Sequence, residues 1–319
     1  MIQVVQQGLL DTIQDGGRYG YQHLGINPGG AMDRIALSVA NSLVGNDANE
    51  AAIEMHFPAS AFVFEADALI ALSGADFGPT VNGLPISINK PVFISEYSVL
   101  RFTRPVSGAR CYLAIAGGLS LVPWLNSYST HLKAEAGGFH GRRLLKGDRL
   151  AFREANHYAE LLKSRELWTL PWSPDLKGLY TDGNNIRVVD APVSLAETDF
   201  TLTEQCDRMG FRLRGKPLAT LHREERLSAG VSRGTIQLLP DGQLIILMAD
   251  HQTTGGYDRI GHVITADLPS LSQLSPNQKI QFREVTHEIA VALFKEQDRH
   301  LQLLQNACKL RLEDWLRHQ

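Results

Sequence analysis

The segment at residues 247–257 gathers the side chains best suited to chemistry. An apolar strand there ends in Asp250, Gln252, Thr253 and Thr254, followed by a Gly-Gly turn. Polar groups at the end of a rigid strand can orient a small substrate. Asp250 could act as a base or hold another polar group, while Gln252 and Thr253 could bind a carbonyl or carboxylate. The alternative is a buried turn in which Asp250 and the threonines accept backbone N–H groups.

Two earlier glycine-rich turns also carry charged side chains. Asp15 and Arg18 lie three residues apart in the first turn. They could pair with each other, or Arg18 could bind a carboxylate or phosphate through two hydrogen bonds. Asp33 follows Gly29-Gly30 at the predicted start of a helix. Free amides at a helix N-terminus attract anions, but Asp33 can also cap these amides itself. A binding and a structural interpretation remain open for both turns.

A third polar stretch combines hydroxyl groups with a basic loop. Ser129 and Thr130 precede a Gly-rich loop that contains Arg142. Hydroxyl groups followed by such a loop suit a carboxylate or phosphate. The alternative is a surface loop whose arginines are solvated.

Several familiar motifs are absent from the sequence. It has no GxxxxGK[ST] phosphate loop, no HExxH zinc motif and no GxSxG nucleophile elbow. The eleven histidines are scattered, and we predict no metal site. Any chemistry must therefore use polar side chains on glycine-rich turns.

The elements that position these residues are mostly short strands bounded by Gly, Pro or Asn, a pattern that favours β-structure. Seven such strands are predicted: 61–65, 69–72, 91–94, 111–116, 186–189, 234–239 and 243–248. Asn82-Gly83 indicates a tight hairpin, because both central residues of a type I′ turn need positive φ. One amphipathic helix is predicted from Asp33 to Val44.

The order of these elements predicts two β-rich lobes. We expect an N-terminal lobe over residues 1–155, a Pro- and turn-rich connector over 156–185, and a second lobe over 186–285. Residues 286–319 are predicted to form an amphipathic helix, with one break possible, that docks on a sheet or on a partner. Its apolar positions are Ile289, Leu293, Leu301, Leu304 and Leu312.

Composition excludes several classes of protein. The chain has 319 residues, of which 44% are apolar and 20% charged, with a net charge of −3. This argues against long disorder and against a dedicated nucleic-acid binder. No apolar run approaches the ~18–20 residues of a membrane helix, and the first residues do not resemble a signal peptide. Three widely spaced cysteines favour a reducing cytoplasm over a disulfide scaffold.

A set of motifs in register over about residues 1–285 carries a family resemblance. They are Gln14–Gly20, Gly30–Asp33, Ala40–Asn46, Tyr112–Gly118, Gly138–Arg142, Asp207–Leu213, Gly234–Gln237 and Gln252–Tyr257. The chain resembles the biotin-dependent carboxyltransferase, or allophanate hydrolase subunit 2, family. That family includes KipA-type proteins and the C component of the bacterial ATP-dependent 5-oxoprolinase.

The resemblance implies two cyclophilin-like β-barrel lobes and a heteromeric enzyme. Proteins similar to the C component act with a KipI-type B component and a LamB/YcsF-type A component. Together they open 5-oxo-L-proline to L-glutamate with ATP and Mg²⁺, activating the lactam by phosphorylation.

The same resemblance implies roles for the polar turns. In this scheme Arg18, Arg142 and Arg208 would face phosphates, and Gln252, Thr253 and Thr254 would bind the substrate carboxylate. We therefore predict catalytic roles for Asp250, Arg208 and Arg142. The residues predicted to bind substrate are Asp15, Arg18, Asp33, Ser129, Thr130, Gln252, Thr253 and Thr254.

Two other functions stay open. One is the carboxyltransferase part of a biotin-dependent, urea-type carboxylase. The chain has no Met-Lys pair, so it lacks the usual biotin attachment site and the carrier would be a separate protein. The other is a KipA-type regulatory protein that binds a KipI-type kinase inhibitor.

Overall fold

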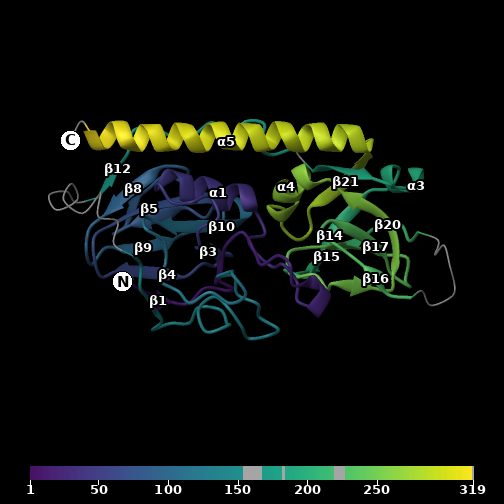
Figure 1. The fold of residues 1–319 in the computed structure, drawn as a ribbon, viewed down its shortest axis with the longest axis horizontal. Helices are drawn as coiled ribbons and strands as arrows, with labels where there is room; N and C mark the ends of the chain where they lie inside the picture. The colour runs from purple at the N-terminus through teal and green to yellow at the C-terminus, as the bar shows by residue number, and fades with distance from the viewer. Residues whose placement is uncertain (154–166, 182–183, 219–226, 318–319) are drawn as a thin grey trace. The chain divides into compact units, whose positions relative to one another are not determined.

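The computed structural model describes residues 1–153, 167–181, 184–218 and 227–317. The chain forms two compact units (Figure 1). Unit 1 contains Met1–Gly17, Asp33–Leu176 and Leu301–Gln319, and unit 2 contains Arg18–Met32 and Lys177–His300. The predicted boundaries were simpler, since they gave residues 1–155 to one lobe, whereas residues 18–32 pack with the second unit. Residues 156–166 and 182–183 of the predicted connector, 156–185, lie outside the described residues.

Unit 1 is built from two six-stranded sheets. The first has the order β11-β1-β4-β9-β6-β7 and the second the order β12-β8-β5-β10-β3-β2. The strands of the first are β1 (Ile2–Gln6), β4 (Ala61–Phe64), β6 (Pro79–Val81), β7 (Leu84–Pro85), β9 (Val99–Phe102) and β11 (Arg149–Leu150). Those of the second are β2 (Thr12–Gln14), β3 (Ala52–Met55), β5 (Ala68–Asp76), β8 (Pro91–Ile94), β10 (Ser107–Ile115) and β12 (Trp168–Thr169).

The two sheets of unit 1 share one apolar core. Ile2, Phe62 and Phe64 from the first sheet and Ile70 and Leu113 from the second are buried in the same cluster. Burying these side chains supplies most of the stability, at about 25 cal/mol for each Å² of apolar surface removed from water.

Local sequence signals set two features of unit 1. Asn82 and Gly83 have φ of 51° and 83° between β6 and β7, which confirms the predicted hairpin. Helix α1 (Arg34–Leu43) begins after Asp33, whose carboxylate accepts the Ala36 N–H at 2.9 Å. This confirms the predicted helix and its cap.

Unit 2 contains a closed barrel with the strand order β13-β20-β17-β18-β15-β14-β21. The strands are β13 (Asn185–Val189), β14 (Phe200–Cys206), β15 (Gly210–Arg214), β17 (Thr235–Leu238), β18 (Leu244–Leu247), β20 (Asp258–Val263) and β21 (Lys279–Glu284). Beside it, β16 (Ala229–Gly230) pairs with β19 (Thr254–Gly255). The short helices are η1 (Gln22–Leu24), α3 (Val193–Ala196), η2 (Thr265–Asp267) and α4 (Leu268–Ser272). Closure leaves the barrel without free edges.

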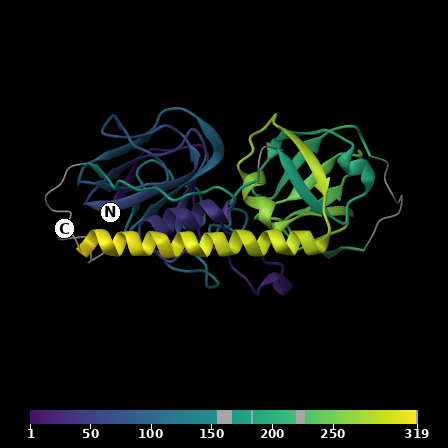
Figure 2. The same cartoon turned by 90° about the horizontal axis from the view of Figure 1, so that it is seen from above.

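Helix α5 (His287–Arg317) is continuous, so the possible break is absent. Its first part belongs to unit 2, where Gln297 donates to the backbone oxygens of Leu179 and Ala266 at 2.7 and 2.8 Å. Its last part belongs to unit 1, where Gln305 donates to Ser38 of α1 at 2.8 Å, and Figure 2 shows α1 alongside it. The predicted amphipathic helix is confirmed, although Ile289 is exposed.

The chain is mainly β with few helices and a C-terminal helix, as predicted. Among the described residues, no helix is both long and apolar enough to span a membrane.

Candidate functional site

The polar turn after β18 lies against the turn before β15. Asp250 N–H donates to the Arg208 backbone oxygen at 2.7 Å, and Met248 N–H donates to that of Met209 at 3.0 Å. Asp207 shapes the second turn by accepting the N–H groups of Met209 and Gly210. Two motifs that are far apart in sequence therefore pack together. We call residues 250–255 the 250–255 turn, and the turn at residues 207–210 its Arg208 support.

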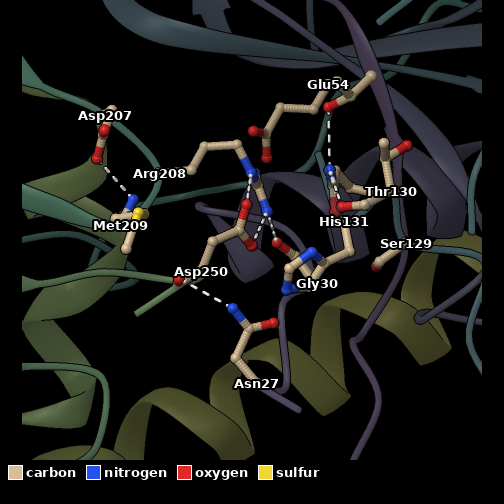
Figure 3. Close-up of polar contacts among 12 residues, drawn as sticks. Asn27, Gly30, Glu54, Ser129, Thr130, His131, Asp207, Arg208, Met209 and Asp250 are labelled. Atoms are coloured by element: carbon tan, nitrogen blue, oxygen red, sulfur yellow. Dashed lines mark hydrogen bonds and ion pairs between the residues drawn. The ribbon is translucent and has the colours of Figure 1, made fainter. Parts of the chain in front are cut away.

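A buried ion pair joins the two turns. Arg208 Nε donates to Asp250 Oδ2 at 2.8 Å and Nη2 donates to Oδ1 at 3.0 Å (Figure 3). Nη2 also donates to the Gly30 backbone oxygen at 2.7 Å. The two side chains are only 4% and 11% exposed. A charge this deeply buried needs its partner, so Asp250 and Arg208 hold each other in place.

The segment 18–32 is bound to the barrel through one of its side chains and through its backbone oxygens. Asn27 Nδ2 donates to the Asp250 backbone oxygen at 2.9 Å, and Arg233 donates to the backbone oxygens of Ala31 and Met32. Gly29 has φ of 59°, and a Cβ built there would lie 3.0 Å from Arg18 Nη1 and 3.5 Å from Asp250 Oδ1. Glycine therefore permits both the positive φ and the close approach of two charged groups.

Two glutamine amides meet at Gly255. A Cβ on this glycine would lie 2.6 Å from Gln237 Nε2 and 2.9 Å from Gln252 Nε2. Gln237 is buried, and its Nε2 has no hydrogen-bond partner among the described residues, whereas Gln252 is exposed. An unused buried donor costs stability, so Gln237 is a candidate ligand group. The sequence reasoning missed this role, although a glutamine within the apolar strand 235–238 was a usable signal.

The remaining residues of the turn have mixed environments. Thr253 is partly buried and its backbone oxygen accepts the Val231 N–H at 3.1 Å, while Thr254 is exposed in β19. His251 is buried beside Asp250, and its Nδ1 contacts the Gln252 backbone oxygen. Burial lowers the pKa of His251 and therefore favours its neutral form.

In unit 1, Asp15 organises a closed hydrogen-bond cluster. Its Oδ1 accepts from Ser127 Oγ at 2.7 Å, Ser129 Oγ at 2.5 Å and Gly17 N–H at 2.8 Å. Its Oδ2 accepts from Tyr128 N–H at 2.6 Å. The structure brings the predicted Asp15 and Ser129 together, but both oxygens of the Asp15 carboxylate accept hydrogen bonds from donors of the chain itself. Arg18, the other charged residue of this turn, belongs to unit 2.

Three other predicted residues in unit 1 have structural partners. Thr130 Oγ1 donates to the Ile13 backbone oxygen at 3.0 Å, and Asp33 caps α1. Arg142 donates through both Nη atoms to Asp148 at 2.6 and 2.9 Å. This carboxylate raises the pKa of Arg142 by stabilising its charged form. Among the described contacts, Arg142 touches none of the Asp15 cluster.

The predicted residues thus fall into separate groups. Arg18, Arg208 and Asp250 come together in unit 2, next to Gln252 and Thr253, while Arg142 lies in unit 1. Because Arg208 is neutralised by Asp250, the donors offered by the 250–255 turn are uncharged amide and hydroxyl groups. Such groups suit a small carboxylate or carbonyl ligand. No cluster of metal-ligating side chains occurs among the described residues.

Curated proteins similar to this chain fall into two groups. It is 35% identical over 314 residues to the C component of 5-oxoprolinase from Escherichia coli (strain K12), covering 95% of this chain and 97% of that protein. The corresponding protein of Haemophilus influenzae is 34% identical over 94% and 96% of the two chains. It is also 30% identical to "Urea amidolyase" of Saccharomyces cerevisiae, over 93% of this chain but only 17% of that much longer protein.

A solved structure shares the fold of this chain. The urea amidolyase of K. lactis superposes with a TM-score of 0.84 at 26% identity, covering 95% of this chain and 20% of that one. Residues 24–284 match the model of the family described as "Carboxyltransferase domain, subdomain A and B". The polar turns, the barrel and these similarities together place the chain in the carboxyltransferase domain family, as the motifs had indicated.

Proposed function

We propose that this chain is the C component of an ATP-dependent 5-oxoprolinase, which activates 5-oxo-L-proline for hydrolysis to L-glutamate. The observation that carries this proposal is similarity from end to end. The alignment with each 5-oxoprolinase component covers more than nine-tenths of this chain and of that component. In the urea amidolyase of Saccharomyces cerevisiae, the similar region is only a small part of the protein. Its partners would be a KipI-type B component and a LamB/YcsF-type A component, in the cytoplasm.

Within this proposal, the 250–255 turn binds the ring. The amides of Gln237 and Gln252 and the hydroxyl of Thr253 can donate to the substrate carboxylate or lactam oxygen. The Arg208–Asp250 pair holds the turn in position. Preorganised donors that need no rearrangement are the main contribution such a site makes to catalysis.

ATP with Mg²⁺ does not fit two of the three arginines considered for it, Arg142 and Arg208. Arg142 and Arg208 each give two guanidinium donors to a carboxylate of this chain, and the sequence has no phosphate loop. We therefore assign triphosphate binding to the assembled complex rather than to these two side chains.

The test is glutamate release by the reconstituted complex in the presence of ATP and 5-oxoproline, with and without this chain. We expect no release when the chain is omitted, and unchanged release would overturn the proposal. Gln252→Ala should raise the KM for 5-oxoproline about 10-fold, the effect of losing one hydrogen bond to a charged group. Gln205→Ala, an exposed glutamine of the same barrel, should leave KM unchanged.

Urea-type carboxyl transfer is the second candidate, because the K. lactis urea amidolyase shares the fold over 95% of this chain. This function needs a biotinylated partner, which streptavidin blotting of the purified complex would reveal. Bicarbonate- and biotin-dependent turnover, without glutamate release, would favour it over lactam opening.

A further inference from the structure

Unit 2 has a cavity of about 530 Å³ that none of the predicted site residues lines. One wall is apolar and includes Ala290, Val291 and Phe294 from the first turns of α5. Val291 and Phe294 remain largely exposed, although the helix packs its other side on the barrel. A cavity of this size and mixed lining is typical of small-molecule sites.

The other wall carries two opposite charges. Asp190 and Arg259 both line the cavity. Among the described residues Arg259 forms no ion pair and donates only to the Gly230 backbone oxygen, at 3.2 Å. Asp190 contacts His287 through Oδ1 alone, at 3.0 Å, and both of these side chains are well exposed. Weak exposed contacts of this kind leave the two charges available to a ligand.

The two charges come from neighbouring parts of the barrel. Asp190 directly follows β13, which pairs with β20, and Arg259 lies on β20. Both residues line the same cavity. An α-amino acid carries an ammonium and a carboxylate close together, so one molecule can offer a partner to each of these side chains.

The neutral groups of the wall complete the pattern. Ser232 N–H donates to Thr235 Oγ1 at 3.2 Å, and Thr235 Oγ1 lies 3.5 Å from His262 Nδ1. Burial lowers the pKa of His262, against the opposing effect of the Asp190 carboxylate. The lowered pKa favours the neutral ring, so the charged side chains that line this wall are those of Arg259 and Asp190.

We propose that this cavity binds a free α-amino acid with an apolar side chain. Arg259 holds its carboxylate, Asp190 holds its ammonium, and the side chain lies against Val291 and Phe294. No residue of the 250–255 turn lines this cavity, although Gly230 of the cavity wall pairs with Thr254 of that turn. The proposal does not depend on the proposed lactam chemistry.

The probe is L-leucine, titrated into the full chain by calorimetry and saturation-transfer NMR. Two analogues each lack one charged group: 4-methylpentanoate has no ammonium and isoamylamine has no carboxylate. We expect leucine to bind at least about 10-fold more tightly than either analogue, because each loses one charge-assisted contact. No binding of leucine at millimolar concentration, or equal binding of 4-methylpentanoate, would overturn the proposal.

Two variants locate the site. Arg259→Gln should weaken leucine binding about 10-fold or more, and Phe294→Ala should weaken it by removing part of the apolar wall. Arg283→Gln is the matched control, since Arg283 is an exposed arginine of the same barrel that does not line the cavity. Equal affinity of the Arg259 and Arg283 variants, with unchanged melting temperatures, would refute the placement.

Discussion

Two of the bidentate Arg–Asp pairs among the described residues, those of Arg208 and Arg142, have similar geometry but different burial. Arg208 and Asp250 are 4% and 11% exposed, whereas Arg142 and Asp148 are 36% and 13% exposed. Because the contact distances are alike, replacing one arginine of each pair isolates the effect of burial. Arg208→Met and Arg142→Met keep comparable side-chain length while removing the charge.

The expected losses differ several-fold. Removing Arg208 leaves the buried Asp250 carboxylate without its ion partner and deprives the Gly30 oxygen of a donor, which should cost about 3–5 kcal/mol. Removing Arg142 breaks a partly exposed pair and should cost about 1 kcal/mol or less. A double variant, Arg208→Met with Asp250→Leu, should recover part of the loss because no uncompensated charge stays buried.

The measurement is urea unfolding followed by circular dichroism, with hydrogen exchange of β15 and β18 to locate the loss. We expect exchange in these strands to accelerate in the Arg208 variant and to stay unchanged in the Arg142 variant. If both variants lose the same stability, burial is not what makes the Arg208–Asp250 pair important, and its role as a rigid support has to be abandoned.

Two further substitutions test unit 1. Burial raises the pKa of the Asp11 carboxyl to about 6 from 3.8. The folded state therefore binds the carboxyl proton more tightly than the unfolded state does. The resulting contribution to the free energy of unfolding is complete below about pH 4 and is lost as the pH rises through 6. Asp11→Asn cannot ionise and should gain up to about 3 kcal/mol relative to the parent between pH 4 and 7; a constant difference in unfolding free energy across this range would contradict the assignment. Gly138→Ala places a Cβ 1.9 Å from Thr130 Oγ1 at φ of 54°, whereas Gly147, at φ of 95°, has nothing within 4 Å. Gly138→Ala should therefore lower the melting temperature clearly more than Gly147→Ala, and equal shifts would show that the loop relaxes freely.

Local features of the fold were predictable from the sequence. The strand at Pro91–Ile94, the Asn82-Gly83 hairpin and the cap at Asp33 depend on neighbouring residues only. Partners across the chain were not predictable in this way. Asp250 is 42 residues from Arg208, and sequence spacing says nothing about whether an arginine faces a ligand or a carboxylate of its own chain.

The same limit applies to the candidate site. Asp250, Gln252 and Thr253 were found because several polar types follow one apolar strand, a pattern that stands out locally. Gln237 was missed because its significance depends on burial without a hydrogen-bond partner, a property of the packed barrel. Asp15 and Arg142 were predicted as site residues because they are polar and lie in turns, and only the structure reveals the donors and acceptors of the chain that contact them.

The interleaved division of the chain has a consequence for biosynthesis. Unit 2 takes residues 18–32 from near the N-terminus, and unit 1 takes Leu301–Gln319 from the C-terminus. Once residue 300 has been synthesised, every residue of unit 2 is present. Unit 1 at that point still lacks the last part of α5, which contributes the buried residues Leu304, Cys308 and Leu312. Unit 1, which contains the first residues to be synthesised, is thus the last unit to have all its residues. Because the ranges of the two units alternate along the chain, cleavage at one peptide bond cannot separate either unit intact.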